Sequence, residues 1–203
     1  MSNTVTAVIL AGGMGRRMDG ADKGLVRLKQ HEMISWVIDV LKPNVSEVII
    51  NANRNLADYE KFGVRVVRDS LEGYQGPLAG FEAGMSAATT EWIYTCPCDS
   101  PMQSPSLLPH IFESVNASPE TEIGVAFDGK RTHPVFSLVR TRLLPSLQSY
   151  LSAGDRKIDR WFDQHKLQQV DCSEFAQSFV NINTSEELEQ AELQKAERSR
   201  DGD

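Results

Sequence analysis

A glycine-rich turn directly after an apolar run is the feature that most constrains this chain. Residues 7–18 read AVILAGGMGRRM, and Asp22-Lys23-Gly24 follows a few positions later. Glycine lets backbone N–H groups approach a ligand closely, and cationic side chains just beyond such a turn favour anions. The segment therefore predicts a buried strand that ends in a phosphate-binding loop, as in nucleotide-dependent enzymes.

The spacing within this loop excludes two common nucleotide-binding patterns. A Walker A loop that starts at Gly15 would need Lys and Ser or Thr where the chain has Ala21 and Asp22. A dinucleotide loop that starts at Gly13 would need its last glycine where the chain has Met18. The loop is therefore predicted to be a third type of phosphate-binding loop.

Apolar runs alternate with helical patterns along the first half of the chain, and the second half changes character. Such alternation predicts an α/β protein with a three-layer α/β/α, Rossmann-like fold and a mostly parallel mixed sheet. The Asp-Gly at 128–129 predicts a hairpin or a longer loop between antiparallel strands. The predicted strands are 5–10, 47–51, 65–68, 92–98, 123–127, 134–139 and 179–183, and the predicted helices are 34–41, 77–88, 142–151 and one capped by Thr184.

Length and charge restrict the classes of protein. The 203 residues, 40% of them hydrophobic, suit a single domain over 1–195, and the charged stretch 196–203 predicts a disordered tail. Lys and Arg number 21 against 28 Asp and Glu, a net charge of −7, which disfavours nucleic-acid binding. No apolar run approaches a membrane span and no signal peptide is visible, so a cytoplasmic location without membrane contact is expected.

Polar residues follow several predicted strands, where open α/β sheets bind ligands. Asp99 stands just beyond the apolar run 92–98, in position to hold Mg²⁺ beside substrate phosphates. As an alternative, Asp99 caps a helix that begins near Pro101. Asn51 and Asp69 close their strands in the same manner; they either form turns or read a nucleoside, and both are expected at the same sheet edge as Gly12 and Asp99.

The three cysteines and His133 are not predicted to bind metal or to act as a general base. Cys96, Cys98 and Cys172 lack a second cysteine pair and a nearby histidine, so a zinc site is disfavoured. We expect these thiols in the core or in a pocket wall. His133, beside Pro134 in a predicted strand, is expected to have a structural or substrate-contact role rather than to act as a general base.

Several motifs, taken in order over residues 5–190, resemble one family. The first motif resembles nucleotidyltransferases of the glycosyltransferase-A-like fold, and Asp22-Lys23-Gly24, in place of the more usual Pro-Lys, resembles the molybdenum cofactor guanylyltransferases. The other matching motifs are Asn51-Ala52-Asn53-Arg54, Asp69-Ser70, Gly76-Pro77-Leu78-Ala79-Gly80, Pro97-Cys98-Asp99-Ser100-Pro101, His133-Pro134, Gly154-Asp155-Arg156-Lys157 and Phe179-Val180-Asn181-Ile182-Asn183-Thr184.

The resemblance implies an enzyme that transfers GMP from Mg-GTP to molybdenum-molybdopterin, giving the guanine dinucleotide cofactor and pyrophosphate. Mn²⁺ is an alternative metal. The implied catalytic residues are Arg17, Lys23 and Asp99, with Asp99 also on the metal. The residues implied to bind GTP are Leu10, Ala11, Gly12, Gly13, Lys23, Asn51, Asp69, Gly80 and Asp99, and those implied to hold the pterin are Arg156, Asn181 and Asn183.

The implied organisation places GTP on the N-terminal half and molybdopterin on the C-terminal half of one domain. Other molybdenum cofactor biosynthesis proteins, apo-molybdoenzymes or their chaperones are implied partners. Two other functions stay open: a nucleotidyltransferase of the same fold that uses CTP or a sugar phosphate, and a non-catalytic nucleotide-binding adaptor in cofactor delivery.

Overall fold

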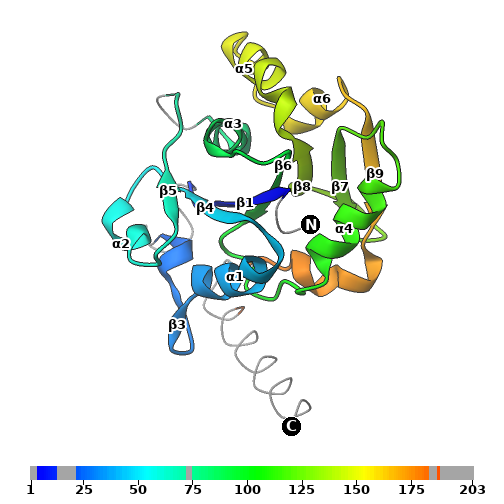
Figure 1. Ribbon diagram of the computed structural model, residues 1–203. Coiled ribbons are helices and arrows are strands. Elements are labelled where there is room, and N and C mark those ends of the chain that lie inside the picture. Colours follow the sequence, from blue (N-terminus) through cyan, green and yellow to red (C-terminus); the bar gives the residue numbers. More distant parts are fainter. Residues whose placement is uncertain (1–3, 13–21, 72–74, 183–186, 188–203) are drawn as a thin grey trace.

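A central sheet with helices on both faces makes up the computed structural model (Figure 1). The structure describes residues 4–12, 22–71, 75–182 and 187. The predicted tail 196–203 and the predicted cap Thr184 lie outside the described residues. Within the described part, no helix is both long enough and apolar enough to cross a bilayer.

Seven strands form the sheet. The interior strand β1 pairs in parallel with β4 on one side and β6 on the other, whereas β8 runs antiparallel to both β6 and β7. The remaining neighbours, β4 with β5 and β7 with β9, are parallel. The predicted mostly parallel mixed sheet is therefore confirmed. In spatial order the strands are β5 (Arg65–Val67), β4 (Glu47–Asn51), β1 (Val5–Leu10), β6 (Trp92–Pro97), β8 (Thr132–Arg140), β7 (Ile123–Phe127) and β9 (Leu167–Asp171).

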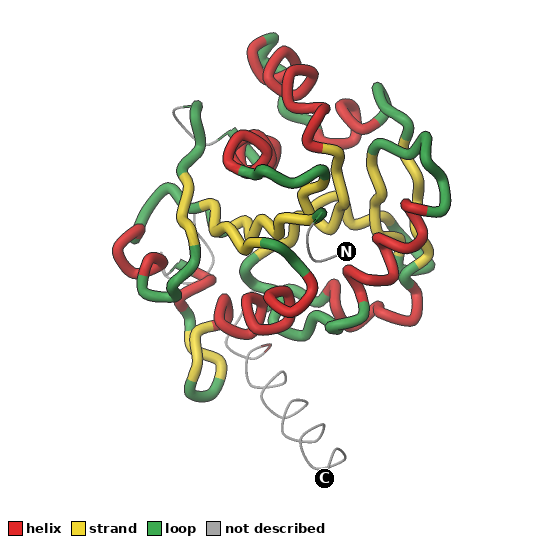
Figure 2. Tube along the Cα trace, viewed as in Figure 1, coloured by secondary structure: helices red, strands yellow, loops and turns green. Residues whose placement is uncertain are grey.

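The two faces of β1 pack into two different cores. Val5, Ala7 and Ile9 belong to a cluster that includes α1 (Met33–Leu41) and α4 (Leu107–Asn116). Val8 points the other way, into the cluster of α3 (Pro77–Ala87), α5 (Leu144–Ser152) and α6 (Ile158–Phe162). Figures 1 and 2 show these two groups of helices on opposite faces of the sheet. Because side chains alternate along a strand, a strand covered on both faces is mostly apolar, and the one polar side chain of β1, Thr6, is buried with its hydroxyl bonded to that of Thr90 at 2.8 Å.

Smaller elements complete the described part. They are η1 (Lys23–Leu25), β2 (Arg27–Leu28), β3 (His31–Glu32), η2 (Lys42–Asn44), α2 (Leu56–Glu60), η3 (Thr141–Leu143) and η4 (Ser173–Phe179). The β2–β3 pair forms a separate two-stranded antiparallel sheet. The predicted hairpin between β7 and β8 is confirmed by their antiparallel register.

The predicted late strand over 179–183 is wrong where the structure describes it. Phe179 ends η4, and Val180 to Ile182 pair with no strand. The apolar residues of this segment reflect local packing instead: Phe179 and Ile182 are buried, and Val180 is exposed. The Ile182 N–H donates to the Asp99 carbonyl at 2.9 Å, so this segment crosses the end of β6 rather than joining the sheet.

Strand β9 was not anticipated from the sequence. Its residues read LQQVD, and only Val170 among them is buried. Among the described strands it pairs only with β7, at the edge of the sheet, so it needs little apolar character. Its position is decided by backbone pairing, which leaves no periodic signal in the sequence.

Helix α3 approaches β1 closely because it carries small residues. A Cβ atom built on Gly84 would lie 2.6 Å from Cγ2 and 2.8 Å from Cγ1 of Val8. Both distances are shorter than carbon contacts allow, so glycine at this position sets the spacing between helix α3 and strand β1.

We expect Gly84→Ala to lower the free energy of unfolding by about 1–2 kcal/mol. Overpacking against Val8 should outweigh the gain in helix propensity of about 1 kcal/mol. Urea denaturation of the single variant, and of Gly84→Ala in a Val8→Ala background, measures this. In that background the alanine should be neutral or stabilising; an equal loss in both backgrounds would contradict the steric explanation.

Candidate functional site

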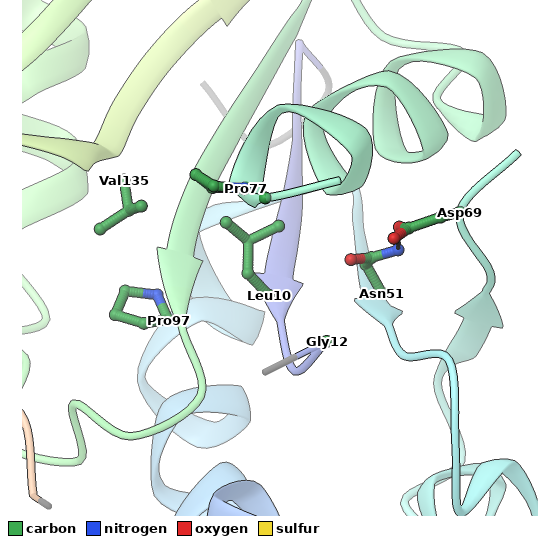
Figure 3. Close-up of a pocket in the computed structure, with 8 residues that line it drawn as sticks. Leu10, Gly12, Asn51, Asp69, Pro77, Pro97 and Val135 are labelled. Carbon is green, nitrogen blue, oxygen red and sulfur yellow. Dashed lines mark hydrogen bonds between the residues drawn. The ribbon is translucent and has the colours of Figure 1, made fainter. Parts of the chain in front are cut away.

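The carboxyl ends of β1, β4 and β6 open into a pocket at one edge of the sheet (Figure 3). Open α/β sheets bind ligands at such edges. The first residues beyond β1 belong to this edge: the Ala11 N–H donates to the Asn51 carbonyl at 2.8 Å, and Gly12 lines the pocket. The full lining is Leu10, Gly12, Asn51, Asp69, Gly76, Pro77, Pro97 and Val135.

A carboxylate held by two amides lies at one end of this pocket. Asn51 Nδ2 donates to Asp69 Oδ1 at 2.8 Å, and Asn53 Nδ2 donates to Asp69 Oδ2 at 2.7 Å. The Asp69 N–H in turn donates to Asn53 Oδ1 at 3.0 Å. Asn51 and Asp69 thus share a sheet edge as predicted, and Figure 3 shows them side by side. Asn53 lay within a matching motif but was not nominated for the site; its polar amide two residues beyond a strand end was the available signal.

Gly80 makes room for this arrangement. A Cβ atom at Gly80 would lie 2.5 Å from Asn51 Oδ1 and 2.6 Å from Leu10 Cδ2. Any larger residue in this turn of α3 would push Asn51 or Leu10 from the pocket. Gly80 therefore shapes the pocket through its lack of a side chain.

A cation and a carboxylate meet beyond the end of β6. Lys23 Nζ donates to Asp99 Oδ2 at 2.8 Å, and Asp99 is 7% exposed. These two residues are 76 positions apart in the chain. Of the three predicted catalytic residues, the structure brings these two together. The third, Arg17, lies outside the described residues, as does the predicted GTP ligand Gly13.

The donor set at Asp99 fits a magnesium ion that is shared with a substrate. Within the described ranges, no three His, Cys, Asp or Glu side chains gather to form a metal cage. Magnesium needs only one or two protein carboxylates when phosphate oxygens and water supply the other ligands. The ammonium of Lys23 against Asp99 Oδ2 shows that this carboxylate accommodates a positive charge.

Asp22, the residue before Lys23, is held in place by three neighbouring side chains. Its carboxylate accepts from the Tyr59 hydroxyl at 2.5 Å and from Asn55 Nδ2 at 3.3 Å, and Arg54 Nε lies 3.4 Å away. Burial above all, with the neighbouring Cys98 and Asp22, raises the pKa of Tyr59 far above its usual range. The tyrosine therefore remains a donor, and Asp22 acts as a buried anchor for the segment that carries Lys23.

The cysteines and His133 belong to the surrounding framework. All three cysteines are buried free thiols, as predicted. Burial raises the pKa of Cys96 to about 12 and that of Cys98 well above its usual range, so neither is a thiolate at neutral pH. His133 bonds Asp128 Oδ2 at 2.8 Å and stacks on Phe179 with ring centroids 4.3 Å apart. These contacts favour the structural role expected for His133.

Two of the three residues predicted to hold a pterin, Arg156 and Asn181, lie in the described part of the chain. Arg156 donates to Gln75 Oε1 at 2.5 Å, next to the pocket residue Gly76, and to the Leu151 carbonyl at 2.7 Å. Asn181 Oδ1 accepts from the Ser100 hydroxyl at 2.7 Å, beside Asp99. Asn183 lies outside the described residues.

Comparison with known sequences finds one family over most of the chain. A family model described as a MobA-like NTP transferase domain matches residues 7–170. The molybdenum cofactor guanylyltransferase of Shewanella piezotolerans is 43% identical over 190 residues, which cover 94% of this chain and 93% of that protein. The protein of the same name from Shewanella pealeana is 44% identical and covers 94% of both chains.

Solved structures of other proteins share the fold. Molybdopterin-guanine dinucleotide biosynthesis protein A from Archaeoglobus fulgidus superposes with a TM-score of 0.77 at 22% identity, covering 95% of this chain and 99% of that one. The 4-diphosphocytidyl-2C-methyl-D-erythritol synthase from Anaerococcus prevotii gives a TM-score of 0.72 at 15% identity, with coverage of 96% and 99%. These structural similarities concern the fold.

We expect Tyr59→Phe to weaken GTP binding as well as stability. Without the Tyr59 hydroxyl, the buried Asp22 carboxylate loses a hydrogen-bond donor. Because the acceptor is charged, the cost is about 1–3 kcal/mol, and the adjacent Lys23 is held less firmly. Titration calorimetry with GTP and thermal denaturation measure the two effects.

Tyr150→Phe provides the matched control, because that hydroxyl donates to the Lys157 carbonyl at 2.9 Å within the α5–α6 region. It should reduce stability without reducing GTP affinity. If Tyr59→Phe binds GTP as tightly as the Tyr150→Phe variant does, the anchor on Asp22 has no part in nucleotide binding.

Proposed function

Because this chain belongs to the molybdenum cofactor guanylyltransferases of the MobA-like NTP transferase family, we propose that it transfers GMP from GTP to molybdenum-molybdopterin. The products are the guanine dinucleotide form of the cofactor and pyrophosphate. The protein is thus an enzyme, a nucleotidyltransferase with GTP and molybdopterin as its substrates.

One structural observation supports this assignment more than any other. The strand-edge pocket has a hydrogen-bonding carboxylate, Asp69, at one end. The Lys23–Asp99 pair lies beyond the end of β6, the strand next to β1. A nucleoside triphosphate needs both features, since its base requires directional hydrogen bonds and its phosphates require positive charge. We assign the base to the Asp69 end and the phosphates to the Lys23 end.

The reaction is an in-line displacement at the α-phosphorus of GTP. The terminal phosphate of molybdopterin supplies an oxygen that forms the new P–O bond, and the bond from the α-phosphorus to the bridging oxygen breaks to release pyrophosphate. A phosphate nucleophile is already ionised near neutral pH, because its second pKa is about 6. The enzyme therefore needs charge neutralisation and alignment rather than a general base.

Lys23 and Asp99 carry the charge neutralisation in this proposal. Lys23 supplies a positive charge to the triphosphate, together with backbone N–H groups after β1 and with Arg17 from the matching motif. Asp99 would hold Mg²⁺, or Mn²⁺ as an alternative, and such an ion supplies charge neutralisation at the phosphate oxygens and the departing pyrophosphate. Asn51 and Asp69 bind the guanosine, with Leu10, Ala11, Gly12, Gly13 and Gly80 forming the surroundings.

The acceptor and the wider partners are proposed on the family resemblance. Arg156, Asn181 and Asn183 are assigned to the pterin. Apo-molybdoenzymes, their chaperones or other cofactor biosynthesis proteins would receive the product, and the cytoplasm is the proposed location. A single domain over 1–195 would hold both substrates.

Pyrophosphate release from each of the four nucleoside triphosphates, with and without molybdopterin, tests the function. We expect release from GTP in the presence of Mg²⁺ and molybdopterin, and loss of release when EDTA removes the metal. Preference for CTP would favour another nucleotidyltransferase of this fold. Nucleotide binding without any release would favour a non-catalytic adaptor.

We expect Asp99→Asn to reduce turnover by on the order of 10²-fold or more, because an amide of the same size lacks the charge that holds the metal. Steady-state pyrophosphate release over a range of Mg²⁺ concentrations measures it. Asp58→Asn is the control, since Asp58 is an exposed carboxylate paired with Lys61. Near-normal turnover of Asp99→Asn at limiting Mg²⁺ would contradict the metal assignment.

A further inference from the structure

We propose that Asn53 is a positioning residue that selects guanine. It holds the Asp69 carboxylate so that this group accepts both donors on the Watson–Crick edge of the base. Asn53 thereby sets the preference for GTP over ITP, which has hypoxanthine in place of guanine and lacks the exocyclic amine. This inference rests on the proposed use of GTP.

Asn53 makes two hydrogen bonds with Asp69. Its amide nitrogen donates to Asp69 Oδ2 at 2.7 Å, while its amide oxygen accepts from the Asp69 main-chain N–H at 3.0 Å. The side-chain amide therefore links the backbone of Asp69 to its own carboxylate. With Asn51 Nδ2 on Oδ1 at 2.8 Å, each carboxylate oxygen has one amide donor, which defines the orientation of the group.

The backbone brings these residues together. Asn53 lies two residues beyond the end of β4, and Asp69 lies two residues beyond the end of the neighbouring β5. The Ala52 N–H donates to the Val67 carbonyl at 2.9 Å, so the pairing of the two strands continues into the loops. Asn53 also lies close to Gly12, since a Cβ atom on Gly12 would lie 3.4 Å from Asn53 Nδ2.

The Asp69 carboxylate has acceptor capacity left. Each carboxylate oxygen accepts about two hydrogen bonds, and among the described contacts each has one from an amide. No ion pair with a described residue neutralises Asp69. A carboxylate in this state suits a ligand edge with two adjacent N–H donors.

Guanine is the common base with such an edge. Its N1–H and its exocyclic 2-amino group lie side by side and both donate. Adenine and cytosine present an acceptor nitrogen beside their amine, and uracil presents one N–H between two carbonyls. Hypoxanthine keeps the N1–H but lacks the amine. Comparing GTP with ITP therefore measures recognition of the amine alone. A site built around a hydrogen bond strongly disfavours an analogue that lacks it.

A second contact holds the backbone after Asp69 independently of Asn53. The Ser70 hydroxyl donates to Glu82 Oε2 at 2.6 Å, and Gln148 Nε2 donates to Glu82 Oε1 at 2.9 Å. Glu82 is buried in α3, 5% exposed, so Ser70 is tied to the helix beside the pocket. Removing the Asn53 amide should therefore release the carboxylate of Asp69 while leaving its backbone in place.

The test compares GTP with ITP in the wild-type enzyme and in Asn53→Ala. Values of kcat/KM from pyrophosphate release, and dissociation constants from titration calorimetry, give the GTP-to-ITP ratio by two routes. We expect wild type to prefer GTP and Asn53→Ala to reduce this ratio by about 10- to 100-fold, mainly through weaker GTP binding. Use of ITP should change much less.

Asn44→Ala is the matched control, because Asn44 Nδ2 also makes one hydrogen bond, to the Pro105 carbonyl at 3.2 Å, away from the pocket. It should keep the wild-type ratio. Asn53 is exposed, so thermal denaturation should show a folded Asn53→Ala variant.

Two outcomes would overturn the proposal. The first is an unchanged ratio in Asn53→Ala, whether neither nucleotide is affected or both lose equally, and the second is a wild-type enzyme that does not distinguish the two nucleotides. Each leaves the proposed function standing if wild type releases pyrophosphate from GTP. If wild type shows no release, the proposed function fails, and the binding ratios still decide the role of Asn53.

Discussion

Burial of β1 on both faces is the constraint on which the rest of this structure depends. Val5, Ala7 and Ile9 pack toward α1 and α4, and Val8 packs toward α3, so the strand has no polar side on which to bind a ligand. Its chemistry must begin where the strand ends. Because β4, β5 and β6 run in the same direction, their polar terminal residues gather at that same edge.

Apolar packing of the sheet therefore supports the site, and a small number of polar contacts at the strand ends shape it. Close approach of α3 needs glycine at positions 80 and 84, because a side chain there would collide with Asn51 or Val8. Asp22 is buried against Tyr59, and this anchor precedes the lysine that meets Asp99. The proposed nucleotide chemistry thus also depends on residues that do not line the pocket, such as Gly84 and Tyr59.

Much of the fold was predictable because buried strands and amphipathic helices leave periodic signals. The strand at Glu47–Asn51 and the strand at Ile123–Phe127 have the predicted bounds. Prediction failed where pairing or local packing replaced periodicity. Polar β9 is an edge strand, and the segment around Ile182 pairs with no described strand but passes the end of β6, where the Ile182 N–H donates to the Asp99 carbonyl. The roles of Arg17 and Asn183 stay predictions.

The sequence by itself determined the class of fold and the family, because glycines, strand-end carboxylates and their order are local properties of the chain. It also pointed to Lys23, Asn51, Asp69 and Asp99. Only the tertiary structure decided which of these meet. The Lys23–Asp99 pair and the grip of Asn53 on Asp69 join residues 76 and 16 positions apart. Such contacts depend on which strands are neighbours, and no local pattern of residues encodes that order.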